Sequence, residues 1–251
     1  MGIEELSELE IVNGIFTLLF VIISLLVGLR ILLKSFEISY GRREYIAVGI
    51  AWMGISTPWL GNSFSFLLFI LLGYRLELVP YLFLENAFIP LAIICWIYAF
   101  STLVYPNSVK KMALIFGVIC IAFEIYLIAN LIINPENIGT LEGNFDSSHT
   151  DIPSLFKVFG IFVVLITGVI FAKKSMNAED KSTQWKGRFL LIAMISFTVG
   201  ALLDVILDFT PIELILVRLL LVSSAIEYYL GFFLPNFVAK RLLKESKSNS
   251  L

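Results

Sequence analysis

Seven apolar runs constrain the fold of this 251-residue chain more strongly than any other feature of its sequence. The hydrocarbon core of a bilayer is about 30 Å thick, so a helix needs roughly 20 mostly apolar residues to cross it. We expect spans at residues 11–33, 45–73, 79–104, 112–133, 152–172, 189–209 and 212–234. They take up nearly the whole chain, which predicts an all-α, seven-helix transmembrane bundle. A soluble catalytic or DNA-binding domain is excluded, and no nucleic-acid partner is expected.

Basic residues crowd the connections on one side of the predicted spans. Cytoplasmic loops carry an excess of lysine and arginine. Fifteen of the eighteen basic residues lie at one set of span ends, namely Arg30, Lys34, Arg42, Arg43, Lys110, Lys111, Lys173, Lys174, Lys181, Lys186, Arg188, Lys240, Arg241, Lys244 and Lys247. We therefore expect a multi-pass protein of the cell membrane with an extracellular N-terminus (1–10), a transmembrane domain (11–234) and a cytoplasmic tail (235–251).

The tail is predicted to form a short amphipathic helix on the inner membrane surface. Phe237, Val238 and Leu242 would face lipid, while Lys240 and Arg241 would meet acidic headgroups. The bilayer is thus a partner along both the spans and the tail.

Two spans contain residues that interrupt a helix. Pro58 lies inside the second run, shortly before Gly61, and Pro90 lies inside the third. Proline removes one backbone hydrogen bond and clashes with the preceding turn. We expect a kinked or tilted helix in the second span, and both prolines would widen a pocket and free backbone carbonyls to face it.

Ionisable residues inside the spans indicate either a functional site or a paired polar interior, because burying a charge in the bilayer is costly. With a rise of about 1.5 Å per residue, Arg218 lies about 9 Å from the outer end of span seven, and Asp204 lies about 7 to 8 Å from that of span six. The connection between these spans is very short, which predicts an Arg218–Asp204 ion pair. Asp208, one turn above Asp204, is a candidate second acceptor.

Further polar residues are predicted at a similar level in other spans. If they converge, they line a pocket open to the outside, in which Arg218 meets an anionic group of a small ligand. The predicted ligand-binding residues are Glu85, Asn86, Glu124, Lys157, Asp204 and Arg218. The alternative is that these charges only pair with one another and fix helix register.

Catalytic, metal and cofactor sites are not expected. The single histidine, His149, falls in the predicted outer loop, whereas an intramembrane zinc site requires several ligands within the spans. The sequence contains no glycine-rich phosphate loop and no Ser-x-x-Lys motif. We expect neither an enzyme, a bound metal nor a cofactor.

In topology the chain resembles rhodopsin-like and receptor-like seven-helix proteins and the membrane parts of some prokaryotic sensors. The basic amphipathic segment after the last span adds to this resemblance. The last span contains no lysine to hold retinal, Thr102-Leu103-Val104-Tyr105 replaces the receptor Asp-Arg-Tyr triplet, and Asn-Pro-x-x-Tyr is absent. The resemblance therefore implies an architecture without retinal, and it transfers no functional residue.

These patterns predict a receptor-like or sensor-like protein that binds a small ligand in its outer half. It would couple to a cytoplasmic signalling partner, a membrane partner or a second copy of itself. The alternative is a transporter or channel for a small solute, proton or cation, with Glu124 and Glu227 at successive depths of a path. A third possibility is a structural subunit in which Glu227 contacts another chain.

Overall fold

A computed structural model describes residues 6–207 and 210–248, and the side chains among them up to residue 243. In this part of the chain seven helical segments are long and apolar enough to cross a membrane, which confirms the predicted all-α fold. The spans are formed by α1 (Glu8–Lys34); α2 (Arg42–Ile55), η2 (Thr57–Trp59) and α3 (Leu60–Leu72); α4 (Leu78–Asn86) and α5 (Ile89–Val104); η3 (Pro106–Ser108) and α6 (Val109–Ile133); α7 (Asp151–Met176); α8 (Lys181–Ile206); and α9 (Pro211–Phe233). The remaining elements are η4 (Pro135–Asn137), β1 (Gly139–Glu142), β2 (Asp146–His149) and α10 (Asn236–Ser248).

Side-chain caps determine where several of these helices begin. Ser7 and Glu10 form a capping box at the start of α1, and Thr210 and Glu213 form another at the start of α9. Asp180 caps α8 by accepting a hydrogen bond from the backbone N–H of Thr183 at 2.9 Å. Helices α1 and α8 therefore start before their apolar runs begin.

The two spans that contain internal prolines are broken, as predicted. Pro58 lies in the 3₁₀ turn between α2 and α3, and Pro90 lies in the first turn of α5, just after α4 has ended. Hydroxyl groups satisfy backbone carbonyls at the first break: Thr57 donates to the carbonyl of Gly54 at 2.7 Å, and Ser56 to that of Met53 at 2.8 Å. Such local satisfaction makes a broken helix tolerable inside a bilayer.

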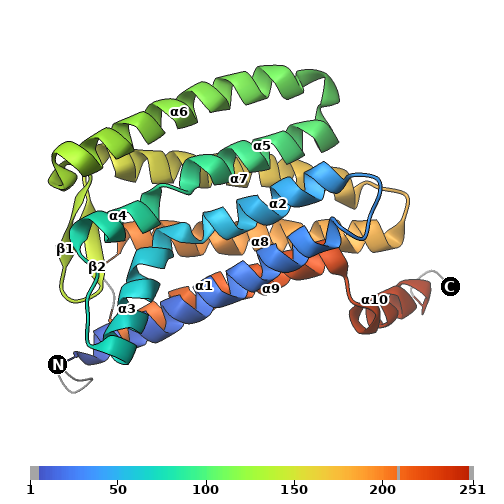
Figure 1. The fold of residues 1–251 in the computed structure, drawn as a ribbon. Helices are drawn as coiled ribbons and strands as arrows, with labels where there is room; N and C mark the ends of the chain where they lie inside the picture. The colour runs from blue at the N-terminus through green and yellow to red at the C-terminus, as the bar shows by residue number, and fades with distance from the viewer. Residues whose placement is uncertain (1–5, 208–209, 249–251) are drawn as a thin grey trace.

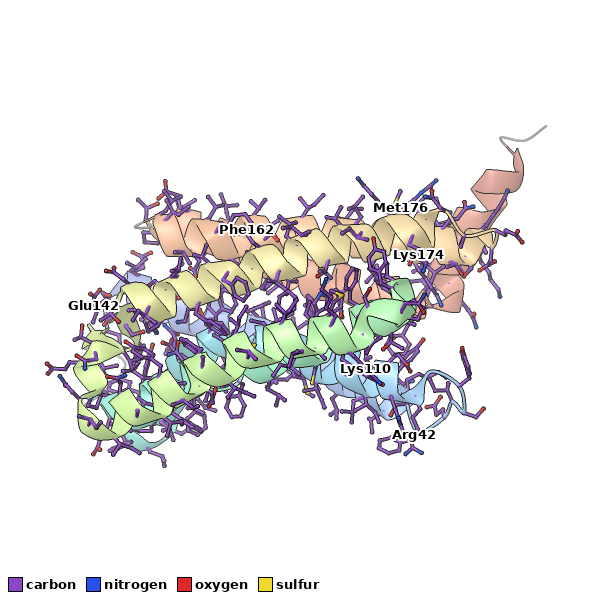
Figure 2. All side chains as sticks on the ribbon, turned by 90° about the horizontal axis from the view of Figure 1, so that it is seen from above. Arg42, Lys110, Glu142, Phe162, Lys174 and Met176 are labelled. Carbon is purple, nitrogen blue, oxygen red and sulfur yellow. The ribbon has the colours of Figure 1, made fainter. Side chains whose placement is uncertain are left out.

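The bundle has two chemically different ends (Figure 1). One, here called the hairpin end, carries the start of α1, the α3–α4 connection and the strands β1 and β2. The opposite, basic end carries the α1–α2, α5–α6 and α7–α8 connections and α10. Figure 2 shows Arg42, Lys110 and Lys174 at the end opposite Glu142. The basic residues therefore gather at one end, and its cytoplasmic orientation stays a prediction.

A β-hairpin, which the sequence pattern did not predict, occupies the long connection between α6 and α7. β1 and β2 pair antiparallel, with Glu142 opposite Asp146. The hairpin is tied to the bundle: Tyr81 donates from its hydroxyl to the carbonyl of Phe145 at 2.6 Å, and the Asn144 amide donates to Glu10 at 2.6 Å. It therefore folds back onto the helices instead of extending away from them.

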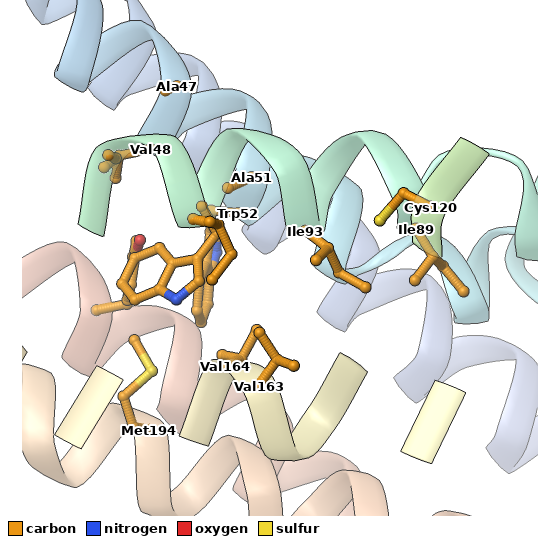
Figure 3. Close-up of a cluster of buried hydrophobic side chains, with 14 of the residues drawn as sticks. Ala47, Val48, Ala51, Trp52, Ile89, Ile93, Cys120, Val163, Val164 and Met194 are labelled. Atoms are coloured by element: carbon orange, nitrogen blue, oxygen red, sulfur yellow. The ribbon is translucent and has the colours of Figure 1, made fainter. Parts of the chain in front are cut away.

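The middle of the bundle and its basic half are filled by large side chains. Trp52 stacks on Tyr228 with ring centroids 3.7 Å apart, and the indole N–H of Trp96 donates to the hydroxyl of Thr167 at 2.6 Å. Figure 3 shows Trp52 beside Val164 and Met194 within this cluster. The core continues from here to the hairpin end, where Tyr81, Leu82 and Ile138 are also fully buried.

Candidate functional site

A cavity of about 590 Å³ opens among the helices at the hairpin end. Every span except the one formed by α6 contributes to its wall, together with the hairpin. Its polar lining comprises Asn13, Trp59, Asn62, Glu85, Glu142, Asp146, Ser147, Ser148, His149, Ser154, Lys157, Asp204 and Arg218, and its apolar lining includes Ile55, Ile89, Ile93, Ile161, Val164, Phe197 and Leu214. Four of the six predicted ligand-binding residues thus border one space.

The predicted Arg218–Asp204 ion pair is present in the wall of the cavity. Arg218 Nη1 lies 2.7 Å from Asp204 Oδ1, and Arg218 Nη2 donates to Asn13 Oδ1 at 3.1 Å. The indole N–H of Trp59 donates to the other carboxylate oxygen, Asp204 Oδ2, at 2.6 Å. Arg218 is only 4% exposed, and its Nε has no acceptor among the described residues. Asp208, the candidate second acceptor, lies outside the described residues.

A second charged cluster joins the hairpin to α4 and α7. Glu85 Oε2 accepts a hydrogen bond from the hydroxyl of Ser147 at 2.9 Å and lies 3.2 Å from His149 Nε2 and 4.0 Å from Lys157 Nζ. Lys157 Nζ lies 2.9 Å from the same imidazole nitrogen. A hydrogen bond from the Lys157 ammonium requires His149 Nε2 as the acceptor, whereas a hydrogen bond to Glu85 requires it as the donor, so the tautomer of the ring decides which of the two forms.

The surroundings of the hairpin shift the pKa values of two of its groups. Burial lowers the pKa of His149, and the Lys157 cation lowers it further, whereas Glu85 acts in the opposite direction. Burial raises the pKa of the Asp146 carboxyl, although part of this side chain remains exposed where it lines the cavity. The carboxylates of Glu85 and Asp204 raise it further and outweigh the influence of Arg218.

Two predicted site residues do not line the cavity. Asn86 lies behind the second cluster, where its amide contacts His149 Nε2 at 3.3 Å and donates to the carbonyl of Leu82 at 2.8 Å. Glu124 is on α6, the outermost helix, which packs chiefly against α5. Its carboxylate oxygen Oε2 is buried and has no hydrogen-bond partner among the described residues. The expected convergence of Glu124 with the other site residues is therefore wrong.

Several cavity residues were not anticipated as site residues. The sequence predicts His149 in the outer loop and names neither it nor Trp59, Asp146 or Ser147 as a site residue. The available signal was a lone histidine and an aspartate, Asp146, in the polar connection before α7. These residues reach the cavity only because the hairpin folds back onto the bundle, which the sequence pattern does not show.

Gly61 lets α4 approach α3 closely enough to place Glu85. A Cβ at Gly61 would lie 2.7 Å from Glu85 Cγ and 3.0 Å from Tyr81 Cε1. Both distances are shorter than ordinary van der Waals contacts between carbon atoms. A residue without a side chain is therefore required where these two helical pieces meet.

Aromatic rings separate the cavity from the basic half of the bundle. Phe197 lines the cavity and packs edge-on against Trp59, with ring centroids 6.2 Å apart. Its ring also packs against that of Trp52, with centroids 6.1 Å apart. Trp52 is in turn stacked on Tyr228. These contacts form the floor of the cavity.

Comparison of the sequence with protein-family models and with curated proteins gives no match, so the chain is assigned to no family on that basis. Among the described residues, no group of three or more histidine, cysteine, aspartate or glutamate side chains is placed to hold a metal ion. The functional argument therefore rests on the cavity.

Proposed function

We propose that this multi-pass membrane protein is a receptor-like or sensor-like protein of the cell membrane that binds a small organic ligand in the cavity at its hairpin end. The observation that carries the proposal is the cavity itself. Its volume of about 590 Å³ lies within the range of about 300 to 1,000 Å³ that is typical of small-molecule sites. Apolar and aromatic side chains together with charged groups that can orient a ligand are also found in such sites, although this wall is more strongly charged than most.

Binding is favoured over passage because the lining ends at an aromatic floor. The described lining on α9 reaches no further than Arg218, and Trp52 and Tyr228 are stacked beyond it. Glu227, which a path toward the basic end would use, is not part of the lining. A ligand entering from the hairpin end would therefore be held at the floor.

Two helices link the cavity to the basic end, where a partner would detect binding. α8 and α9 pack against each other, and both contribute to the cavity wall through Asp204 and Arg218. A ligand that shifts this ion pair acts on both helices at once. The partner is then a cytoplasmic protein, a membrane protein or a second copy of this chain that contacts the basic end.

The test is ligand-induced thermal stabilisation of the purified protein, screened with a chemically diverse library of small organic molecules. Ile161→Trp places a large ring at a residue that lines the cavity, and Ile166→Trp makes the same change on α7 at an exposed residue that does not. Compounds that stabilise the unmodified protein and Ile166→Trp but not Ile161→Trp support the proposal. If every stabilising compound acts equally on both variants, or no compound stabilises the protein, the proposal is wrong.

Transport of a proton or cation is the second candidate, and one observation favours it. Glu124 and Glu227 each hold a buried carboxylate oxygen without a hydrogen-bond partner among the described residues. In proteoliposomes, pH-driven uptake that is lost in Glu124→Gln and Glu227→Gln supports this candidate. Absence of flux for protons and common cations would reject it.

A further inference from the structure

We propose that the ligand of the cavity is an organic cation, namely an amine with an apolar body, whose ammonium group lies beside Asp146. This inference rests on the proposed binding function and adds the charge of the ligand. It differs from the expectation of an anionic group at Arg218.

The charge balance of the cavity wall is the first argument. The described lining contains four carboxylates, Glu85, Glu142, Asp146 and Asp204, but only two cations, Lys157 and Arg218. Even with His149 counted as a third cation, the carboxylates outnumber the positive groups. The wall therefore carries an excess of negative charge, which a bound cation compensates.

Both cations already have partners, whereas two of the carboxylates do not. Arg218 pairs with Asp204 at 2.7 Å, and Lys157 lies 2.9 Å from His149 and 4.0 Å from Glu85. Asp146 takes part in no ion pair within the described chain, and the same holds for Glu142. An anionic ligand that paired with Arg218 in place of Asp204 would leave that carboxylate without its cation, which is unfavourable.

Asp146 lies in a negative environment that favours a cation next to it. Burial raises the pKa of Asp146, and Glu85 and Asp204 raise it by more than Arg218 lowers it, so the ionised carboxylate lacks a compensating positive charge. An ammonium group within about 4 Å would reverse this effect by direct attraction. Asp146 also has accessible surface, so a ligand can reach it without rearrangement of the hairpin.

Other residues of the cavity wall can contact the polar and apolar parts of an amine ligand. Asn62 is only 5% exposed and borders the cavity, and its carbonyl oxygen Oδ1 has no donor among the described residues. A hydrogen-bond donor of a bound ligand supplies the missing partner. Trp59 and Phe197 present aromatic rings, which attract cations as well as apolar groups.

The experiment compares three molecules of nearly equal shape: 4-phenylbutylamine, 4-phenylbutanol and 4-phenylbutanoic acid. Affinities are measured at pH 8, where Asp146 is the more fully ionised, in nanodiscs of zwitterionic lipid, and empty nanodiscs correct for partitioning. We expect the amine to bind at least about 10-fold more tightly than the alcohol, and the acid to bind most weakly.

Two variants with the same chemical change locate the effect. Asp146→Asn should weaken amine binding about 10-fold and leave alcohol binding unchanged. Asp151→Asn, at an exposed residue outside the cavity lining, should change neither. Tighter binding of the acid than of the amine, amine binding that Asp146→Asn does not affect, or no binding of the amine overturns the inference.

Failure of this inference is distinguishable from failure of the proposed function. If the acid or the alcohol binds more tightly than the amine and Ile161→Trp abolishes that binding, the cavity is a ligand site but not one for cations. If the diverse library contains no compound whose effect depends on Ile161, the binding function itself fails.

Discussion

The hairpin end of this bundle encloses a polar cavity, whereas large side chains fill the space between the same seven spans in the basic half. At the hairpin end, Arg218 and Lys157 lie in the wall of a cavity and are held by carboxylates and a histidine. In the basic half, Trp52, Tyr228 and Trp96 fill the space between the helices. The difference shows that the broken helices and the hairpin create a polar cavity at one end, while unbroken stretches of helix pack tightly at the other.

The largest effect is expected from removing a ring in the packed half. Trp52 is 1% exposed, so Trp52→Ala leaves a void and should lower the free energy of unfolding by about 3 kcal/mol. Because lipid is as apolar as the core, this loss is mainly one of packing. Trp185→Ala, at a half-buried tryptophan near the start of α8, should cost clearly less in the same detergent unfolding assay. Equal losses would show that Trp52 is packed no more tightly than a half-buried tryptophan of the same half.

The ion pair at the hairpin end should come next in size. Arg218→Ala leaves Asp204 without its cation and should cost about 2 kcal/mol, less than for a fully buried pair because the Asp204 side chain is 19% exposed toward the cavity. Adding Asp204→Asn removes the stranded charge and keeps an acceptor for Trp59, so the double variant should recover at least half of that loss. If the double variant is less stable than Arg218→Ala, the stranded charge is not the cause.

A smaller loss is expected where the backbone places Glu85. Gly61→Ala puts a methyl group 2.7 Å from Glu85 Cγ and should cost about 1 to 2 kcal/mol by overpacking. Gly117→Ala on α6 makes the same change where nothing lies within 4 Å of the new Cβ, and it should be neutral or slightly stabilising. Similar losses in the two variants would contradict the close approach of α4 to α3.

The smallest effect is a pH dependence confined to the hairpin end. Burial lowers the pKa of His149, so the unfolded chain takes up the proton first as the pH falls through about 6.5, and the folded state loses stability. Between pH 7.5 and 5.5 we expect a loss of at most about 1 kcal/mol relative to His149→Gln. His149 is the only histidine in the sequence, and the raised pKa of Asp146 acts with the opposite sign in both proteins. An identical pH profile for the two proteins would mean that the imidazole titrates freely.

Much of the architecture could be predicted because hydropathy and helix breakers are local properties. The positions of seven spans, the interruptions at Pro58 and Pro90 and the gathering of basic residues at one end all follow from runs of neighbouring residues. The Arg218–Asp204 pair could also be predicted from the sequence, because a very short connection forces α8 and α9 to lie side by side. Which end faces the cytoplasm stays a prediction.

The sequence by itself thus determined how many helices there are and which charges sit near the same end. Tertiary structure alone decided that α6 contributes no residue to the cavity, so that Glu124 lies outside it, and that the hairpin returns to bring Asp146 and His149 into it. The physical reason is that helix packing and loop closure depend on contacts between residues far apart in the chain, such as Tyr81 with Phe145 and Asn144 with Glu10. No pattern of neighbouring residues encodes those contacts.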